Sequence, residues 1–535
     1  MGVIFNQGNL NVAALQAPGS YIKIVPPPSY VQGVPTDVFA ILGTASWGPV
    51  GKPVLAGGIP DTKRNFGGIN SVSPGDPHDL CRAATIAFQQ NISQASNEGY
   101  LVRISDGSDD PATVTLQDGQ GTPANGIAIT AIFTGIDGNQ ISLNIQAGSL
   151  PNCFNVTLVP FKGARPEYYT NIPGVAGTAA SPFWTNLLNA INSGQNNVRG
   201  KSQLVVASTA STTAQNPVIG TYTLSGGTDG RGVDSADFIG TDGNTGAGTG
   251  IYSLRGLPKP PGIIWLAGFT DHTEFTAIQA FVDSEAMLSL FSFPTGTDSA
   301  TAVTGKQSYG IDDPNCLYCK DWVYWQDTTN GVLSLVDPAS FIGGMISCLS
   351  PEQSPGNKPV YGVVGTERFS PYSGDEPYSL SETGLLASNG ILFIAKPIPR
   401  GNTWGLPHGK NSSSNPVTAP IEYSRMINYL ARELSAAMGL FVDELQTQRA
   451  NDPLRAAVKL ELDTLLGNLK TLGQIDDFYT VCDLTNNSPQ TIQQHYLFAD
   501  VYVRFLASAD FIVISLEGGT TVVTVNVTLP TPLAA

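Results

Sequence analysis

The sequence predicts a mixed multidomain protein of the α+β class, with an α/β core domain, an inserted antiparallel β domain and a C-terminal α+β domain between extended terminal arms. Three observations carry this prediction. The chain has 535 residues, well above the roughly 150 residues of an average domain. Its 58 Gly and 38 Pro residues indicate many turns between short strands. The hydrophobic period changes along the chain, from strand–helix–strand units to strict alternation and then to helical stripes.

The charge balance restricts the class of partner. Lys and Arg total 27 against 43 Asp and Glu, so the net charge is 27 − 43 = −16, which argues against direct binding of nucleic acid. Only 13% of residues are charged, yet 41% are hydrophobic, enough to build packed cores. A weakly charged surface suits a chain that buries much of its exterior against copies of itself.

The compartment follows from cysteines and apolar runs. The six cysteines are scattered, which favours a reducing compartment over a disulfide scaffold. The first residues, MGVIFNQGNL, lack a signal-peptide pattern, and no apolar run approaches the 18 or so residues that cross a bilayer. We therefore expect a soluble protein made in the cytoplasm, without membrane insertion.

The first part of the core domain is expected over residues 21–105, after an N-terminal arm over 1–20. Apolar runs bounded by Pro or Gly predict strands, and an Ala-rich stripe predicts a helix. The expected elements are strands Tyr21–Val25, Val38–Leu42 and Gly99–Ile104, and a helix Pro77–Asn91.

Residues 106–225 read as an inserted outer domain rich in β-structure. Alternating runs such as 113–116, 127–132 and 141–145, separated by Asp-Gly turns, predict antiparallel hairpins. One helix is expected near Phe183–Ile191. The glycine-rich stretch Ser225–Gly250 is interpreted as a flexible return linker.

The second part of the core domain is expected over 226–400. Gly262–Ala267, Asp271–Met287 and Leu288–Phe293 read as strand, helix and strand, which predicts a parallel βαβ unit. Further strands are expected at Trp322–Trp325 and Gly331–Val336.

The C-terminal domain is expected over 401–517, and a C-terminal arm over 518–535. Helical spacing predicts a helix Ile421–Met438; Asp452 as N-cap and Pro453 start a second helix, which Gly473 ends. Strands are predicted at 477–481, 495–505 and 511–516. A last strand over 520–529 has no evident partner nearby in the sequence.

Motifs for catalysis or cofactors are weak, so we expect no enzyme activity and no catalytic, cofactor or metal residues. Cys316 and Cys319 have the spacing of half a zinc site, but a second ligand pair is missing and buried thiols are the simpler interpretation. The glycine-rich 246–250 lacks the Lys-Ser/Thr of a phosphate loop, and no Gly-x-Ser-x-Gly elbow occurs.

An ordered set of short motifs runs along the chain: Pro18–Ile22, Gly33–Val38, Leu42–Ala45, Gly48–Gly51, Leu224–Gly230, Trp322–Asp327, Asn451–Leu454, Phe478–Asp483 and Ala509–Val513. Together these motifs resemble the contractile tail sheath proteins of bacteriophages and related contractile injection particles. Two stretches, Asp337–Pro359 and Trp404–His408, depart from the family pattern.

The resemblance implies a structural subunit that polymerises as stacked hexameric rings around a tail tube in a metastable extended state. Contraction then drives the tube through the host envelope. The implied partners are further copies of the chain, the tail tube protein, and baseplate and tail terminator proteins. The implied location is the virion tail, assembled in the host cytoplasm, with the C-terminal domain innermost and the terminal arms adding strands to neighbouring subunits.

Two groups of candidate contact residues follow. Strand donation needs unpaired strands, and the candidates in the two arms are Leu10, Val12, Ala14, Thr521, Val523, Val525 and Val527. Arg455 and Lys459, one turn apart on the second helix, are candidates for facing an acidic tube surface, against the plainer interpretation of a solvated face. The alternative function is a glycan-binding or glycan-cleaving β-rich tail protein, which the inserted β domain favours and the α/β core disfavours.

Overall fold

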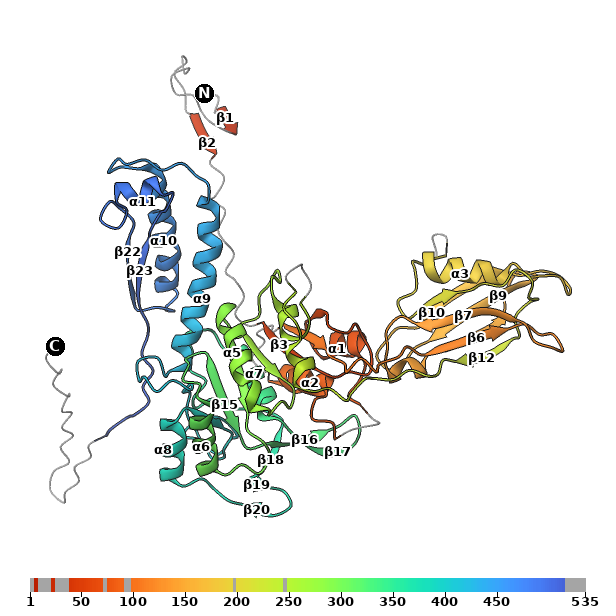
Figure 1. Ribbon diagram of the computed structural model, residues 1–535, viewed down its shortest axis with the longest axis horizontal. Coiled ribbons are helices and arrows are strands. Elements are labelled where there is room, and N and C mark those ends of the chain that lie inside the picture. The colour runs from red at the N-terminus through yellow and green to blue at the C-terminus, as the bar shows by residue number, and fades with distance from the viewer. Residues whose placement is uncertain are drawn as a thin grey trace.

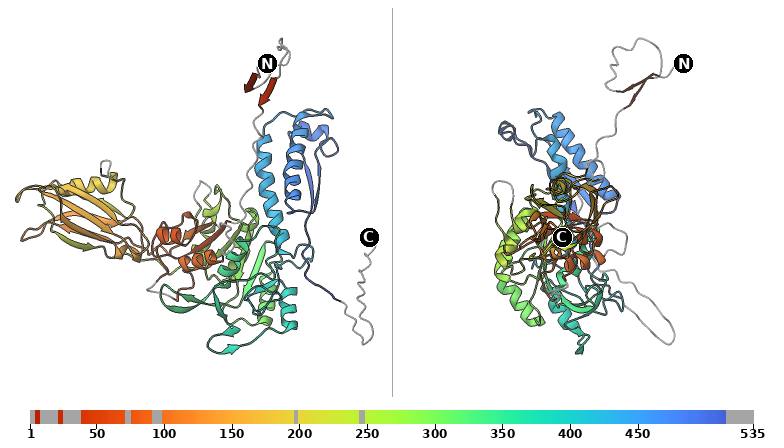
Figure 2. Two further views of the ribbon diagram at one scale, coloured as in Figure 1. Left: turned by 180° about the vertical axis from the view of Figure 1, so that it is seen from behind. Right: turned by 90° about the vertical axis from the view of Figure 1, so that its right-hand side faces the viewer.

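The computed structural model has an elongated shape, in which the inserted β domain projects sideways from a central α/β domain and the C-terminal domain rises from its other end (Figure 1). The structure describes residues 4–7, 21–24, 38–70, 75–90, 98–195, 199–243 and 248–514. Figure 2 shows the same separation of the inserted and C-terminal domains from behind.

The central domain is built on a seven-stranded sheet with the order β21-β15-β14-β13-β3-β5-β4. Six strands are parallel and β4 runs antiparallel to β5 at one edge. The predicted parallel βαβ unit is therefore present. The strands are β3 Phe39–Gly43, β4 Pro53–Ala56, β5 Gly99–Arg103, β13 Ile263–Leu266, β14 Leu288–Ser292, β15 Cys316–Lys320 and β21 Ile391–Phe393.

Helices cover both faces of this sheet, because its strands alternate side chains between two buried layers. On β3, Phe39 and Ile41 pack toward α1 Ile59–Phe66, α2 Leu80–Gln89 and α7 Pro338–Ser347. Ala40 and Leu42 face the other layer. That layer holds α4 Ser235–Ile239, η3 Gly250–Leu254, η4 His272–Glu274, α5 Phe275–Ser284, α6 Ser299–Tyr309 and α8 Leu380–Ser388.

A small antiparallel sheet and a hairpin extend the central domain. The sheet has the order β17-β16-β18, and the hairpin joins β19 to β20. Their bounds are β16 Val323–Asp327, β17 Val332–Val336, β18 Val363–Thr366, β19 Phe369–Ser370 and β20 Gly374–Asp375.

The inserted domain consists of two antiparallel sheets closed over one core. The sheets have the orders β10-β9-β8-β12 and β11-β7-β6, and helix α3 packs on the core through Trp184 and Leu187. The predicted hairpins and helix are present. The bounds are β6 Thr113–Gln117, β7 Asn125–Ala131, η2 Ile136–Gln140, β8 Ser142–Ala147, β9 Cys153–Val159, β10 Glu167–Pro173, α3 Phe183–Ser193, β11 Val205–Ser208 and β12 Gly220–Thr223.

The C-terminal domain pairs two long helices with a two-stranded sheet. Helix α9 spans Ile421–Met438 and α10 spans Pro453–Thr471, where the Asp452 carboxylate caps α10 by accepting from the Arg455 N–H at 3.0 Å. The antiparallel sheet joins β22 Asp477–Val481 to β23 Asp500–Arg504. The short helices are η5 Gly439–Phe441 and α11 Pro489–Gln493.

Two expectations about local structure were wrong. Residues 511–514, predicted to be strand, form no strand in the structure, because no strand among the described residues pairs with them. The return segment was interpreted as a flexible linker, but residues 225–243 are held by hydrogen bonds to the core and contain α4. Glycine permits the backbone turns of this segment, and hydrogen bonds of the Asp229 and Arg231 side chains hold it against the rest of the fold.

Candidate assembly surfaces

The C-terminal domain uses only part of its apolar surface for its own core. Val458, Leu462, Leu466 and Leu469 of α10 are buried, whereas Leu472, which follows the helix, is 73% exposed. Large contiguous apolar patches on a protein surface mark interaction sites. The exposed apolar side chains of this domain include Ile427, Leu440, Val442, Leu445, Leu460, Leu472, Tyr479, Tyr496, Phe498 and Tyr502.

The segment Phe511–Ile514 is the most exposed apolar run that the structure describes. Its four side chains, Phe, Ile, Val and Ile, are between 81% and 89% exposed. The segment follows β23 and forms no ladder with any strand that the structure describes, so an added strand could pair with its backbone N–H and C=O groups. A β-prone apolar run in this state is a ready partner for the sheet edge of another molecule.

The candidate strand-donating residues of the arms lie outside the described residues. This holds for Leu10, Val12 and Ala14, and for Thr521, Val523, Val525 and Val527. The described part of the N-terminal region consists of two strands, β1 Ile4–Gln7 and β2 Tyr21–Ile24, which pair in parallel (Figure 1). Strand donation by both arms therefore stays a prediction.

The two candidate tube-facing residues occupy different environments. Arg455 is 2% exposed, and its guanidinium donates to the backbone carbonyls of Thr447, at 2.9 Å, and Arg449. Lys459 is partly exposed; its ammonium donates to the Thr480 carbonyl at 2.8 Å and lies 3.6 Å from the Asp463 carboxylate. Arg455 thus supports the loop before α10, and Lys459 is the side chain of the pair that reaches solvent.

The Cys316 and Cys319 pair is split by the sheet. Both lie on β15, and their side chains enter opposite buried layers. Burial raises the pKa of Cys316 to about 12 and that of Cys319 well above its ordinary value. The two thiols are packing residues on separate faces, as the simpler interpretation predicted. Among the described residues, no group of three or more His, Cys, Asp or Glu side chains is placed to hold a metal ion.

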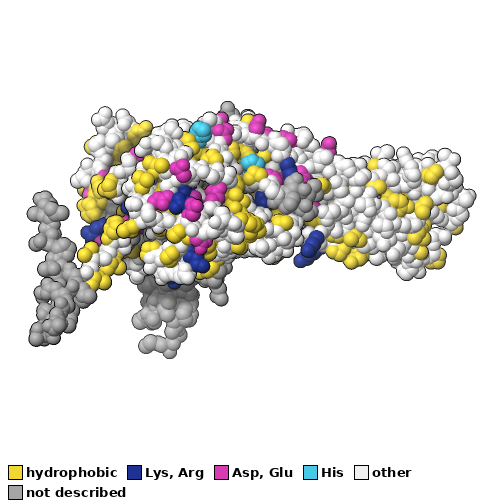
Figure 3. All heavy atoms as spheres, turned by 90° about the horizontal axis from the view of Figure 1, so that it is seen from below, with side chains coloured by type: hydrophobic (Ala, Val, Ile, Leu, Met, Phe, Trp, Pro, Cys, Tyr) yellow, Lys and Arg dark blue, Asp and Glu magenta, His cyan; other side chains and the backbone are white. Residues whose placement is uncertain are grey.

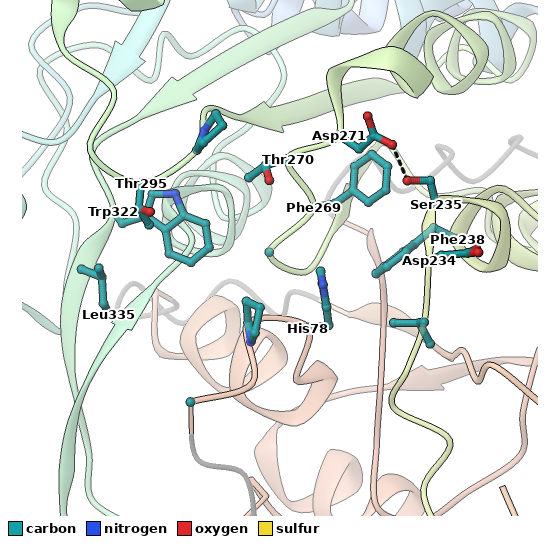
Figure 4. Close-up of a pocket in the computed structure, with 15 residues that line it drawn as sticks. His78, Asp234, Ser235, Phe238, Phe269, Thr270, Asp271, Thr295, Trp322 and Leu335 are labelled. Carbon is teal, nitrogen blue, oxygen red and sulfur yellow. Dashed lines mark hydrogen bonds between the residues drawn. The ribbon is translucent and has the colours of Figure 1, made fainter. Parts of the chain in front are cut away.

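A pocket of about 510 Å³ lies at the carboxyl ends of β13 and β14, where α/β sheets commonly bind ligands (Figure 4). Its polar groups are engaged within the fold. His78 Nδ1 lies 2.8 Å from the Ala267 carbonyl oxygen. The Ser235 hydroxyl donates to Asp271 at 2.5 Å, and this bond lowers the Asp271 pKa. The pair ties α4 to the loop after β13.

The junction between the core and the inserted domain is a buried charge network that sequence analysis missed. Arg231 binds Asp76 at 2.5 Å and Asp229 at 2.8 Å. Arg103, at the end of β5, donates to the carbonyl oxygens of Thr134 at 2.7 Å and Asp229 at 3.1 Å. Burial, reinforced by the negative charge of Asp229, raises the pKa of Asp137 to about 7. These contacts orient the inserted domain on the core.

Comparisons with known proteins agree on the fold. The chain is similar to the sheath tail protein of Listeria innocua, with a TM-score of 0.57 at 14% identity over 89% of this chain and 96% of that protein. The sheath tail protein of Desulfitobacterium hafniense gives 0.54 at 15% identity, covering 87% and 93%. The contracted helical sheath of the anti-feeding prophage gives 0.51 at 12% identity, covering 94% and 100%.

A sequence comparison points the same way over a shorter stretch. The chain is 32% identical over 101 residues to the tail sheath protein of Vibrio phage KVP40. That stretch is 19% of this chain and 14% of the phage protein. No family profile matches the sequence. Among the described residues, no helix combines the length and apolar character needed to span a membrane.

Proposed function

We propose that this chain, which has the fold of contractile tail sheath proteins, is the structural subunit of a contractile phage tail sheath. In this proposal subunits stack as hexameric rings around the tail tube, in a metastable extended state assembled in the host cytoplasm. Contraction drives the tube through the host envelope. The partners are further copies of the chain, the tube protein, and the baseplate and terminator proteins.

The exposed segment Phe511–Ile514 is the observation that carries this proposal. A soluble monomer gains nothing by holding four large apolar side chains in water, whereas burying each of them is worth about 1.5–3 kcal/mol. Main-chain hydrogen bonds in an added strand contribute on the order of 1 kcal/mol each. A strand donated to a neighbour would keep subunits connected while their folded domains change position, which a contracting sleeve requires.

The lack of a nucleotide-binding motif in the sequence also fits a subunit whose free energy is stored in the assembled state. The glycine-rich 246–250 lacks the lysine of a phosphate loop. A sheath subunit needs no bound nucleotide, because contraction releases free energy already stored in subunit contacts. We infer that the chain acts by repacking and not by catalysis.

Electron microscopy of the purified chain tests the proposal. We expect sleeves or rings from the full chain, and a soluble monomer from a variant lacking residues 518–535, because the terminal strand is lost. Removing residues 1–17 should stop assembly in the same way. Compact full-length monomers with affinity for glycans would instead support the alternative, a glycan-binding tail protein, and normal sleeves from both truncations would refute strand donation.

A further inference from the structure

The charges of the inserted domain gather at its base. Between residues 138 and 228 only five residues are charged, and four of them are basic. Figure 3 shows the same segregation, since the projecting end of this domain carries almost no charged side chains. Lys162 and Arg165 lie in the loop before β10, Glu167 is the first residue of β10, and Arg199 and Lys201 lie in a second loop; the fold brings these segments together beside α1.

These loops border a pocket of about 640 Å³ between α1 and the inserted domain. Its apolar lining includes Trp47, Ile132 and Phe133, and its basic lining includes Arg165 and Lys201. Such a pocket suits a ligand that combines apolar and acidic groups. The chain as a whole is strongly acidic, so a basic pocket on it is an exception that needs a reason.

Two basic residues of the pocket have no internal role. Arg199 is used within the fold, because it binds Glu167 at 3.0 Å and lies 4.6 Å from the centre of the Tyr169 ring. By contrast, both Arg165 and Lys201 are exposed, and neither forms an ion pair within the part of the chain that the structure describes. Their charges are available to a partner.

The β19–β20 hairpin and its flanks offer the complementary surface. Glu376 has a side chain that is 77% exposed and lies beside the exposed Asp375; Tyr372 and Leu380 add apolar groups that are 73% and 90% exposed. Glu376 lies 3.9 Å from Arg368, which already binds Glu382 at 2.9 Å. The hairpin lies at the lower edge of the central domain and α1 lies well above it, in both Figure 1 and the left view of Figure 2.

We propose that this basic pocket receives the acidic β19–β20 hairpin of a second copy of the chain. The inference rests on the proposed function, because it names one contact between sheath subunits. The two surfaces lie on different sides of one molecule, so the contact is head-to-tail and propagates from copy to copy, as a helical assembly requires. Opposite charges set the register of the contact, and the apolar lining receives Tyr372 or Leu380.

Charge reversal on each side tests the contact. The variant R165E/K201E has an acidic pocket, and D375K/E376K has a basic hairpin. Each alone places like charges together, so we expect the critical concentration for sleeve formation, measured by light scattering and electron microscopy, to rise about tenfold or more. An equimolar mixture of the two should polymerise again, because each chain then meets a complementary surface only on the other.

The control K410E/R449E makes the same change in net charge at residues that line neither the basic pocket nor the pocket beside the hairpin, and it should polymerise like the wild type. Circular dichroism melting confirms that each variant is folded. If the wild type forms sleeves and each charge-reversal variant assembles equally well, or if the mixture fails to assemble, this contact is overturned. Either result leaves the proposed function standing. A wild-type chain that forms no sleeves at all would overturn the proposed function itself.

Discussion

The inserted domain and the C-terminal domain differ in how their apolar side chains are packed. The inserted domain closes two sheets and α3 over one continuous core, and its surface beyond the base is nearly uncharged, with exposed apolar side chains such as Leu150 and Ile219. The C-terminal domain has two small core clusters and leaves large apolar side chains in water, ending in Phe511–Ile514. The first has one continuous core, whereas the proposed function has a partner cover the exposed apolar run of the second.

The largest expected effect is on sleeve formation, and it comes from placing a charge at an exposed apolar position of the C-terminal domain and not of the inserted domain. Phe511→Asp should abolish sleeve formation, because a charge in a donated apolar strand cannot be buried without great cost. Tyr168→Asp, at an exposed position of the inserted domain, is the matched control and should assemble normally. Negative-stain electron microscopy distinguishes the two, and equal behaviour of both variants would remove the contrast between the domains.

The second largest expected effect is a loss of folding stability caused by a substitution in the core of the inserted domain. This effect does not depend on assembly. Trp184 is fully buried, and its indole N–H donates to the Gln215 carbonyl at 2.8 Å. Trp184→Ala should lower the free energy of unfolding of this domain by about 3–5 kcal/mol, through lost burial and a cavity. Urea unfolding of an isolated fragment spanning residues 106–230 measures it. A fragment that does not fold alone would show that one continuous core is not enough to stabilise this domain.

The junction between the inserted domain and the core should show a pH dependence of smaller size. The pKa of Asp137 in the folded chain is raised from 3.8 to about 7, so the folded state holds a proton that the unfolded state has already lost in that range. This group therefore contributes stability that is present below about pH 4 and declines as the pH rises to about 7.

Asp137→Asn should remove that decline. Relative to this variant, we expect wild-type stability to fall by on the order of 3 kcal/mol between pH 4 and pH 8, measured by urea unfolding at each pH. The expected sign is opposite for Asp76, whose pKa is lowered because hydrogen bonds from His78 and Arg231 outweigh the effect of burial. Parallel pH profiles for the wild type and Asp137→Asn would show that the carboxyl is not protonated in the folded state.

The smallest effect concerns the tube. Lys459→Glu should weaken assembly templated by the tube severalfold at low salt and little at high salt, because exposed charges are screened. Cosedimentation with tube at two salt concentrations measures it. Arg455→Glu is not an equivalent test, since a buried carboxylate against the Thr447 and Arg449 carbonyls would destabilise the domain itself. No change in Lys459→Glu would favour the solvated-face interpretation.

The local sequence pattern was sufficient to predict the two long helices of the C-terminal domain. Helix α9 has the predicted bounds Ile421–Met438, and Asp452 and Pro453 start α10 as expected, because capping and helical periodicity depend on neighbours in the sequence. The placement of Cys316 and Cys319 on opposite faces of the sheet also follows from the sequence, since residues three apart on a strand face opposite sides. Helices α1, α6 and α8 were missed, because they are short or weakly patterned.

By itself, the sequence determined the order of the domains, the strand and helix periods and the acidic charge, since all of these are properties of neighbouring residues and of composition. Only the tertiary structure decided which charges are buried and which are available. Arg455 and Arg231 became internal supports, while Arg165 and Lys201 were left facing solvent at one pocket. The reason is that burial and ion pairing join residues far apart in the chain, such as Arg231 and Asp76, which are 155 positions apart, and no local sequence pattern predicts such a contact.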